Sequence, residues 1–330
     1  MKLLVTGGCG FIGSAFVRLA LDKGVDVVNF DKLTYAGDPE NVADVADHPH
    51  YSFVQGDIAD ADAVNTALPG CDAIINFAAE THVDRSILDP SDFIRTDVQG
   101  TATLLAAARE HGVKRFVQVS TDEVYGSIPT GSFRETDPLK PSSPYSASKA
   151  GGDMQVLAWH NTFGVDALIT RGSNTFGPRQ YPEKLIPLFI TNAMDGLSLP
   201  VYGDGQQVRD WIFMDDHCTG IWTAFERGEA GEIYNVGGGH EMPNMDITNR
   251  IVAMTGADPA IITYVEDRLG HDRRYSLDTT KLRGLGWAPN RSFDEALEET
   301  VAWYAARRDW WEPIKSGEYL EYYKAQYGSR

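Results

Sequence analysis

The sequence predicts an α/β protein in which a doubly wound parallel sheet carries a smaller, interleaved C-terminal domain. In the first half of the chain, short apolar runs alternate with longer helix-like segments. Near-continuous apolar strands are typical of parallel sheets that helices cover on both faces. Beyond that half, proline and glycine become frequent and the alternation is lost, which indicates a second unit. We expect a first domain at 1–173, with returning segments at about 207–239, and a second domain formed by 174–206 and 240–330.

The elements of the first domain follow from the positions of the apolar runs. The expected strands are 2–6, 25–30, 51–55, 72–78, 115–120 and 165–170. The expected helices between them are 11–23, 60–68, 92–111 and 144–163. Gly24 ends the first of these helices and Pro144 opens the last, as glycine and proline commonly do. The tail at 293–330 is expected to be helical, with aromatic side chains that pack in the core rather than bind a ligand. These aromatic residues are Trp303, Trp310, Trp311, Tyr319, Tyr322, Tyr323 and Tyr327.

Composition and charge exclude several classes of protein. The 330 residues carry 29 Lys and Arg against 47 Asp and Glu, so the formal net charge is −18. A net anion repels phosphate backbones and anionic membranes, so we expect no nucleic-acid partner and no membrane partner. No apolar run approaches the roughly 18 residues of a membrane span. Cys9, Cys71 and Cys218 lie far apart without a CxxC pair, so we expect no disulfide framework, no metal site and a cytoplasmic location.

A glycine pattern between the first strand and the first helix predicts a dinucleotide site. Gly7, Gly10 and Gly13 allow a tight turn whose backbone amides, with the helix N-terminus, face a pyrophosphate, as in Rossmann-type sheets. Asp31 ends the next strand, where a carboxylate accepts hydrogen bonds from a ribose 2′-hydroxyl and repels a 2′-phosphate. The expected cofactor is therefore NAD. Asp57 follows the third strand, where it either meets the adenine amine or caps a helix.

Tyr145 and Lys149 form a candidate catalytic pair. They stand four residues apart in PYSASKA, a segment expected to be helical, so both lie on one helix face. A nearby ammonium favours the phenolate, which lets a tyrosine act as a base near neutral pH. An incidental exposed pair has the same spacing, so the pattern alone leaves both interpretations open.

Two adjacent acids form a second candidate catalytic feature. Asp122 and Glu123 follow the expected strand 115–120, in the run STDEVYG. Ligands of open α/β sheets bind at the carboxyl ends of the strands. Two close carboxyl groups tend to have separated pKa values, so one can be an acid while its neighbour is a base. A turn with a helix cap and two solvated charges is the alternative interpretation.

Eight motifs, in order along the chain, give it a resemblance to a known family. They are GGCGFIG, DKLTYAG, FAAETHVDRS, STDEVYG, YSASK, PEKLIP, YGDG…VRDW and DRLGHD. From residue 2 to about residue 312, the chain resembles the extended short-chain dehydrogenase/reductases, and within them the dTDP-glucose 4,6-dehydratases. The resemblance implies a hydro-lyase that uses NAD to convert dTDP-glucose to dTDP-4-keto-6-deoxyglucose. The implied steps are oxidation at C4, elimination of water across C5 and C6, and return of hydride to C6.

The same resemblance implies a role for each candidate residue. Tyr145, beside Lys149, removes the proton of the C4 hydroxyl, and Thr121 hydrogen-bonds the C4 oxygen. Glu123 takes the proton from C5, and Asp122 protonates the departing C6 hydroxyl. The implied cofactor-binding residues are Gly7, Gly10, Phe11, Ile12, Gly13, Asp31, Lys32, Leu33, Thr34, Asp57, Ile58, Phe77, Ala78, Ala79, Thr96, Tyr145 and Lys149. The implied substrate-binding residues are Glu80, Thr81, Thr121, Asn174, Lys184, Leu185, Pro200, Tyr202, Arg209, Asn244, Arg268 and His271.

Five positions depart from the family pattern. Thr175 stands where the family usually has a second Asn, and Phe176 stands where Tyr is usual. Asp97 replaces an Asn, Thr81 replaces a Ser, and Leu269 replaces a Pro. Thr175 and Asp97 remove amides near the cofactor or the core, so their contacts cannot be taken from the family. None of the five is the predicted acid, base or tyrosine.

Other functions stay open on the sequence. Residues 241–243 beside Asn244 leave base selectivity undecided, so the alternative is a dehydratase or 4-epimerase acting on a UDP- or CDP-sugar. A GDP-mannose dehydratase is disfavoured because Asp31 opposes NADP, and a non-catalytic NAD-binding scaffold is disfavoured because the catalytic side chains are present. The superfamily also implies a homodimer through the helices 92–111 and 144–163. The pathway, cell-wall rhamnose or a secondary metabolite, is undecided.

Overall fold

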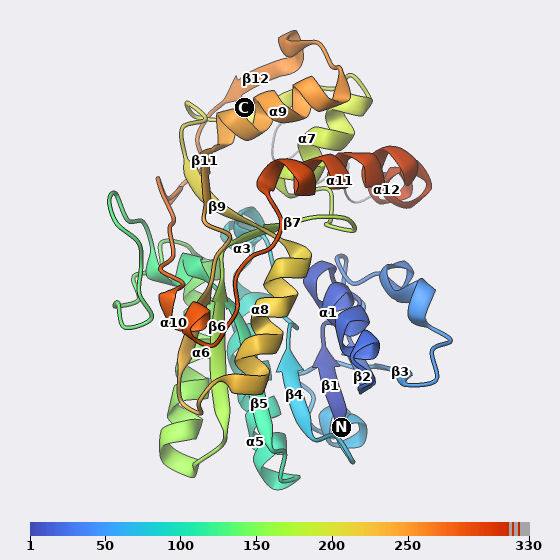
Figure 1. Cartoon of the computed structure of the whole chain (residues 1–330), viewed down its shortest axis with the longest axis vertical. Coiled ribbons are helices and arrows are strands. Elements are labelled where there is room, and N and C mark those ends of the chain that lie inside the picture. The colour runs from blue at the N-terminus through green and yellow to red at the C-terminus, as the bar shows by residue number, and fades with distance from the viewer. Residues whose placement is uncertain (317–318, 320–322, 324–330) are drawn as a thin grey trace.

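A seven-stranded parallel sheet forms the centre of the molecule (Figure 1). The computed structural model describes residues 1–316 together with Tyr319 and Tyr323. The strands are β1 (Lys2–Thr6), β2 (Asp26–Asp31), β3 (Tyr51–Gln55), β4 (Ala73–Asn76), β5 (Arg115–Thr121), β6 (Ala167–Gly172) and β10 (Ile233–Val236). Their order is β10-β6-β5-β4-β1-β2-β3, and all six pairings are parallel. The predicted α/β class with a doubly wound sheet is confirmed.

The order of the strands reverses at β1, and this reversal marks the position along the sheet where a ligand is expected to bind. From β1 the chain runs through β2 and β3 on one side and then returns to β4, β5 and β6 on the other. Ligands of open sheets bind beyond the carboxyl ends of the strands at such a reversal. Leu3 in β1 pairs with Val27 in β2 and Ala73 in β4, so the three strands end together. The glycine turn, Asp31 and the segment after Asn76 therefore meet at one edge.

Successive side chains of a strand are buried on opposite faces of the sheet. Leu3 and Val5 belong to the hydrophobic cluster beneath α1 and α8, whereas Leu4 belongs to the cluster beneath α2, α5 and α6. None of the three is exposed. The helices are α1 (Phe11–Asp22), α2 (Ala61–Ala67), α5 (Thr101–Glu110), α6 (Pro144–Phe163) and α8 (Met214–Arg227). Burial on both faces is why these strands are almost continuously apolar.

A second lobe lies beyond the carboxyl edge of the sheet, at the top of Figure 1. It contains a three-stranded sheet, β11-β9-β7, and a two-stranded sheet, β12-β8. Its strands are β7 (Asn174–Phe176), β8 (Leu199–Tyr202), β9 (Val208–Phe213), β11 (His240–Pro243) and β12 (Ile262–Val265). Its helices are α7 (Leu185–Met194), α9 (Asn244–Thr255), η4 (Pro259–Ile261), α11 (Phe293–Ala306) and α12 (Arg308–Ile314). One buried cluster continues from α1 and α8 into this lobe, so the two parts share a core.

The segment 207–239 divides between the two lobes. β9 belongs to the three-stranded sheet of the second lobe, whereas α8 packs on the main sheet and β10 joins its edge beside β6. The short helix α10 (Thr280–Gly284) then contacts β10. The chain therefore crosses between the lobes several times, which is why their cores are continuous.

The predicted helix 92–111 differs from the observed structure. It consists of α4 (Ser91–Phe93), a π-helical turn η2 (Ile94–Gly100) and α5. A Cβ on Gly152 of α6 would lie 2.7 Å from the carbonyl oxygen of Asp97, so η2 and α6 approach closely. The spacing of apolar residues within 92–111 does not predict this contact, because the contact depends on the position of the partner helix α6. Two further short segments, η1 (Pro39–Val45) and α3 (Val83–Leu88), were not predicted.

The aromatic side chains of the tail pack into the core, as predicted. Trp310, Trp311 and Tyr319 are buried, and Trp303 and Tyr323 pack against the same cluster. The predicted members Tyr322 and Tyr327 lie outside the described residues. These helices therefore close the second lobe by packing.

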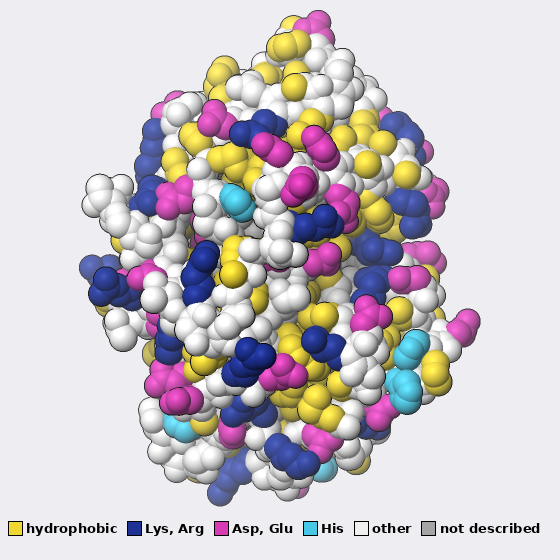
Figure 2. All heavy atoms as spheres, in the orientation of Figure 1, with side chains coloured by type: hydrophobic (Ala, Val, Ile, Leu, Met, Phe, Trp, Pro, Cys, Tyr) yellow, Lys and Arg dark blue, Asp and Glu magenta, His cyan; other side chains and the backbone are white. Residues whose placement is uncertain are grey.

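The surface is charged and mixed in sign. Acidic and basic side chains are interspersed over the face shown in Figure 2. Cys9, Cys71 and Cys218 are all unpaired. In the described part of the chain, no helix combines the length and apolar character needed to cross a bilayer.

Candidate active site

The glycine turn after β1 borders a cavity of about 300 Å³ at the reversal point of the sheet. Gly7 has a φ of +67°, and a Cβ there would lie 2.7 Å from the backbone nitrogen of Ala78. A Cβ on Gly13 would lie 2.1 Å from the carbonyl oxygen of Gly7. The N-cap of α1, Gly10, places no side chain over the first amides of the helix. This open cradle of backbone N–H groups suits a pyrophosphate.

Asp31 is buried at the end of β2 and lines the same cavity. Its Oδ2 accepts the N–H of Cys9 at 2.9 Å, and its Oδ1 accepts the N–H of Leu33 at 2.8 Å. Burial raises the pKa of Asp31, and these two N–H groups oppose the rise. Each carboxylate oxygen can accept a further hydrogen bond, so a ribose hydroxyl fits beside the backbone contacts.

Most of the predicted cofactor residues line this first cavity. They are Gly7, Gly10, Phe11, Ile12, Gly13, Asp31, Lys32, Thr34, Asp57, Ile58, Phe77, Ala78, Ala79, Thr96, Tyr145 and Lys149. Leu33 is not among the lining residues, and with a φ of +59° it turns its N–H toward Asp31 instead. Asp57 accepts the N–H of Ala59 at 2.9 Å and pairs with Lys32 at 3.0 Å. A contact between Asp57 and an adenine stays a prediction.

Thr121, Asp122 and Glu123 stand where β5 ends and the single turn η3 (Asp122–Tyr125) begins. The Thr121 hydroxyl accepts the N–H of Glu123 at 3.2 Å and donates to Asp122 Oδ1, also at 3.2 Å. Gly126, with a φ of +82°, ends the turn, and a Cβ there would lie 2.4 Å from the carbonyl oxygen of Lys140. The two acids therefore occupy a fixed turn rather than a solvated loop.

The two carboxyl groups have different electrostatic surroundings. Asp122 is 2% exposed, and its Oδ2 has no hydrogen-bond partner among the described residues. Burial, together with the neighbouring charge of Glu123, raises the pKa of Asp122 well above its usual value. Burial also raises the pKa of Glu123, but three cationic side chains oppose that rise. They are Arg268, Arg209 and Lys184. Asp122 is therefore suited to donate a proton, and Glu123 to accept one.

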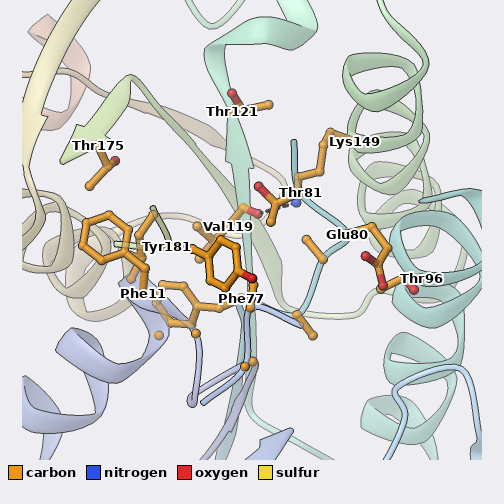
Figure 3. Close-up of a pocket in the computed structure, with 18 of the residues that line it drawn as sticks. Phe11, Phe77, Glu80, Thr81, Thr96, Val119, Thr121, Lys149, Thr175 and Tyr181 are labelled. Atoms are coloured by element: carbon orange, nitrogen blue, oxygen red, sulfur yellow. Dashed lines mark hydrogen bonds between the residues drawn. The ribbon is translucent and has the colours of Figure 1, made fainter. Parts of the chain in front are cut away.

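Helix α6 presents Tyr145 and Lys149 to the first cavity. A capping box between Ser143 and Ser146 starts the helix. Lys149 Nζ donates to the carbonyl oxygen of Val119 at 3.0 Å. In Figure 3, Lys149 projects from α6 toward Val119, and its nitrogen lies beside Thr81 in this view.

The surroundings of Tyr145 act on its pKa in two directions. Burial, followed by the charge of Glu123, raises the pKa of Tyr145 well above 10, although a hydrogen bond with Thr121 opposes the rise. These surroundings favour the phenol over the phenolate. Its ionisation depends on positive charge close by, of which Lys149 is the source on the same helix.

A second cavity, of about 160 Å³, lies beneath the second lobe. Glu123, Asn174 and Lys184 line both cavities, so the acid–base turn stands at their junction. The predicted substrate residues that line the second cavity are Asn174, Lys184, Leu185, Pro200, Tyr202, Arg209, Asn244, Arg268 and His271. The other three predicted substrate residues, Glu80, Thr81 and Thr121, line the first cavity.

Unpaired polar atoms indicate that the second cavity suits a polar ligand. Within the described residues, Arg268 Nε, Asn174 Oδ1 and Asn244 Oδ1 are buried without a hydrogen-bond partner. Buried polar groups in native proteins nearly always have partners. Arg209 is 4% exposed, and two backbone carbonyls hold its guanidinium at 2.8 and 2.9 Å. Fixed guanidinium groups in an acidic protein suit a diphosphate.

Several lining residues were not among the predicted site residues. The buried ones include His82, Asp84, Glu183, His217 and Tyr275. Glu183 belongs to the motif PEKLIP, so the motif itself was a signal for it. His217 and Tyr275 lie in distant segments without a local signal, because only the folded chain brings them to the cavities.

The positions that depart from the family pattern have specific contacts. Thr175 Oγ1 lies 2.7 Å from Nδ1 of the buried His217. Asp97 Oδ2 accepts a hydrogen bond from Ser148 at 2.6 Å, on the residue next to Lys149. Leu269 is 79% exposed beside the second cavity. Asp97 therefore places a carboxyl group at the contact between η2 and α6.

These features define a class of protein. A dinucleotide cradle, a Tyr–Lys pair on α6 and a cationic cavity under a second lobe together make an extended short-chain dehydrogenase/reductase that modifies a nucleotide sugar.

Comparison with known proteins narrows this class. The family model described as GDP-mannose 4,6 dehydratase matches residues 4–300. A dTDP-glucose 4,6-dehydratase of Streptomyces niveus is 52% identical over 323 residues, which cover 96% of each chain. A double mutant of the Streptomyces venezuelae dTDP-glucose 4,6-dehydratase, solved with NAD and a dTDP-sugar bound, has 53% identity and a TM-score of 0.94. That match covers 96% of this chain and 100% of the other.

More distant structures share the fold. A UDP-glucose 4-epimerase of Thermus thermophilus, solved in complex with NAD, is 31% identical with a TM-score of 0.87. That match covers 93% of this chain and 100% of the other. The chain belongs to the dTDP-glucose 4,6-dehydratases, within the family that the GDP-mannose 4,6 dehydratase model describes. The family indicated by the sequence motifs is confirmed.

Proposed function

We propose that this chain is an NAD-dependent hydro-lyase that converts dTDP-glucose to dTDP-4-keto-6-deoxyglucose. The observation that carries the proposal is the turn after β5, where Asp122 and Glu123 have opposed surroundings at the junction of two cavities. An acid and a base placed side by side suit removal of water from neighbouring carbons. A 4-epimerase needs the tyrosine and the dinucleotide but has no use for this pair. Membership of the dehydratase family supports the same activity.

The first cavity would hold the dinucleotide. Backbone amides of the glycine turn and of α1 bind the pyrophosphate, and Asp31 accepts hydrogen bonds from a ribose. When bound, NAD supplies a hydride acceptor for C4 of the sugar and a hydride donor for C6.

Tyr145 takes the proton of the C4 hydroxyl, while Thr121 hydrogen-bonds the C4 oxygen. Because burial raises the pKa of Tyr145, this step requires the ammonium of Lys149 to stabilise the phenolate. The carbonyl of Val119 holds that ammonium at 3.0 Å. In this proposal Lys149 supplies a fixed positive charge that stabilises the phenolate, and it does not itself accept the proton of the substrate.

Asp122 and Glu123 carry the elimination. A ketone at C4 acidifies the proton at C5, and the Glu123 carboxylate removes it. The Asp122 carboxylic acid donates its proton to the C6 hydroxyl, which leaves as water. Glu123 then returns its proton to C5 as C6 accepts hydride. The opposed surroundings of the two groups match these opposite tasks.

The second cavity would hold the nucleotide diphosphate. Arg209, Arg268 and Lys184 supply the positive charge, and the unpaired amide oxygens of Asn174 and Asn244 accept hydrogen bonds from the ligand. Their arrangement around Glu123 brings the hexose end of the substrate to the junction of the cavities.

The test is a substrate panel of dTDP-, UDP- and CDP-glucose with the purified enzyme. We expect dTDP-glucose to give a 4-keto product that absorbs in alkali, and Glu123→Gln to lose this product. Conversion of only a UDP- or CDP-sugar would replace the proposed substrate. A 4-epimer without a keto product would establish an epimerase, and no turnover of any sugar would overturn the proposal.

We also propose a homodimer in the cytoplasm. Ile87, Leu88, Ile94 and Met154 are large apolar side chains that are 40%, 69%, 58% and 46% exposed. They lie on α3, η2 and α6, and both α3 and η2 pack against α6. A second copy would cover this exposed apolar surface. The unpaired cysteines support a reducing compartment.

A further inference from the structure

We propose that Tyr35 and Glu183 are positioning residues that couple occupation of the dinucleotide cavity to the binding of the nucleotide sugar. This inference rests on the proposed function, because that function names the two ligands. Tyr35 is in the segment after β2, and Glu183 immediately precedes Lys184 at the start of α7. Tyr35 is not among the residues that line either cavity, whereas Glu183 lines both.

The contact between the two residues is part-buried, with Glu183 on its buried side. The Tyr35 hydroxyl lies 2.9 Å from Glu183 Oε1 and 2.9 Å from the carbonyl oxygen of Thr81. Glu183 is 4% exposed, so its carboxylate is removed from water. Hydrogen bonds to a buried charged group are stronger than neutral ones. Tyr35 therefore connects the segment after β2 to the substrate side of the molecule.

Arg85 completes this cluster from a third segment. Its Nε lies 2.9 Å from Glu183 Oε2, and its guanidinium carbon lies 3.8 Å from the centroid of the Tyr35 ring. The charge of Glu183 is thus balanced, and the tyrosine ring is held between the cation and the carboxylate. A part-buried ion pair of this kind contributes position rather than large net stability.

One end of the cluster leads to the dinucleotide cavity. Lys32, Thr34 and Gly37, which flank Tyr35, line that cavity. Asp31 Oδ1 accepts the N–H of Leu33 at 2.8 Å, and a Cβ on Gly37 would lie 2.8 Å from the same oxygen. The segment that carries Tyr35 is therefore folded against the carboxylate that faces the ribose. A dinucleotide that binds Asp31 restrains this segment and, with it, the Tyr35 hydroxyl.

The other end leads to the nucleotide-sugar cavity. Lys184 Nζ donates to Thr81 Oγ1 at 3.0 Å and lines both cavities. Thr81 is thus contacted on its carbonyl by Tyr35 and on its hydroxyl by Lys184. When Tyr35 is fixed, Glu183 and Thr81 hold Lys184 in the direction of the proposed diphosphate. When the segment after β2 is free to move, Tyr35 no longer fixes Glu183 and Thr81, and Lys184 is held less firmly.

Coupling of this kind is reciprocal and measurable. If NAD tightens the binding of the nucleotide by some factor, the nucleotide tightens the binding of NAD by the same factor. Couplings between sites are typically about 5- to 150-fold. Thymidine diphosphate is the probe, because it fills the proposed nucleotide site without reacting. Its dissociation constant is measured by calorimetry on NAD-loaded and NAD-depleted enzyme.

The decisive variant is Tyr35→Phe, which keeps the ring over Arg85 and removes the hydroxyl. We expect NAD to tighten thymidine diphosphate binding about five-fold or more in the parent enzyme, and less than about two-fold in this variant. Tyr234→Phe is the matched control. Its hydroxyl accepts the N–H of Glu229 at 2.9 Å, far from both cavities on β10, so its coupling should equal that of the parent.

A second variant keeps the inference testable if Tyr35→Phe folds poorly. Glu183→Gln preserves the size of the side chain and weakens the contacts with Tyr35 and Arg85, so its coupling should fall in the same way. Turnover adds a further readout, since we expect Tyr35→Phe to raise KM for dTDP-glucose while kcat at saturation changes little. Parent-like coupling in both variants, or no coupling in the parent, would overturn the inference.

The two proposals fail separately. If the parent enzyme turns over no sugar nucleotide, the proposed function is wrong, yet coupling between NAD and thymidine diphosphate is still measured by binding. If the parent turns over dTDP-glucose and Tyr35→Phe keeps the full coupling, the function stands and the positioning role is wrong.

Discussion

At the scale of single residues, the same carboxyl group behaves differently according to what surrounds it. Asp122 and Glu123 are neighbours in the chain, yet Asp122 is buried beside another acid and Glu123 faces three cations. The Thr121 hydroxyl contacts both residues and fixes the turn. Two chemically similar side chains thus become suited to the proposed roles of proton donor and proton acceptor, because burial and neighbouring charge shift their pKa values to different extents.

Replacing Asp122 with Asn tests the donor role. Asn has nearly the same size but cannot protonate a leaving hydroxyl, so we expect keto-product formation to fall by about 10²- to 10⁴-fold. In the proposed mechanism, oxidation at C4 uses Tyr145 rather than Asp122. It should therefore still occur, and reduced nicotinamide should accumulate on the enzyme. Rapid-mixing absorbance of the reduced cofactor, with a product assay, measures both effects. A variant with parent-like product formation would assign the donor role to another group.

Asp97 provides a test of stability against pH. It is buried, and in the described chain its Oδ1 has no hydrogen-bond partner. Burial raises its pKa from 3.8 to about 6, with Lys149 opposing the rise. Between these values the folded state holds a proton that the unfolded state has lost. Stability therefore falls as pH rises through this window.

Asp97→Asn should remove that dependence. We expect the variant to melt at a higher temperature than the parent at neutral pH, and at nearly the same temperature at about pH 4, where Asp97 is protonated. Thermal unfolding across this pH range measures the difference. Ser148→Ala is the control for the lost hydrogen bond alone. A lower melting temperature for Asp97→Asn at neutral pH would show that the charge stabilises the fold.

At the scale of elements, the turn between β1 and α1 shows how backbone geometry makes a site. Gly7 adopts a positive φ and passes close to Ala78, and Gly13 lets the first turn of α1 pack on Gly7. The glycine spacing predicts this strand–turn–helix unit, because few other arrangements need small residues at all these positions.

Gly13→Ala should disrupt this unit. The new Cβ would lie 2.1 Å from the carbonyl oxygen of Gly7, so α1 must move away from β1. We expect NAD affinity to fall by about ten-fold or more, since overpacking costs about 1–3 kcal/mol. Gly24→Ala is the matched control. It has a φ of +72° and nothing within 4 Å, so it should lower stability through backbone strain but leave NAD affinity unchanged. Calorimetry and thermal unfolding separate the two effects.

Helix α6 and the π-turn η2 mark the limit of prediction at this scale. The bounds of α6, Pro144–Phe163, agree with the expectation, because a proline opens the helix and a glycine ends it. The predicted helix 92–111 instead contains η2, whose geometry depends on how closely α6 approaches. The residues that cap a helix can be recognised in the local sequence, whereas a change of helical pitch caused by a neighbouring helix cannot.

At the scale of the whole molecule, function depends on the two lobes sharing a core. One hydrophobic cluster extends from α1 and α8 into α7, α9 and α11, so the lobes hold a defined position. That position places Glu123 and Lys184 at the junction of the two cavities. Neither lobe by itself contains both the dinucleotide cradle and the cationic cavity.

The proposed homodimer leads to a prediction at the same scale. Met154 on α6 is 46% exposed and lies on an element that contacts η2 and α3. We expect the parent to have the mass of a dimer by light scattering and Met154→Glu to shift toward the monomer, because a charge would be buried in the interface. Leu197→Glu is the control, since Leu197 is similarly exposed, at 50%, but outside these elements. A monomeric parent would contradict the proposal.

The sequence by itself determined the parallel sheet, the glycine cradle, the Tyr–Lys spacing and the adjacent acids. Each of these is a local pattern of residue size, polarity or backbone freedom. The tertiary structure decided what those groups experience: which carboxyl is buried, which cations face Glu123, and how Tyr35 meets Glu183 across 148 positions of the chain. The reason is physical, because burial and charge at a residue depend on atoms from distant segments that only folding brings within contact.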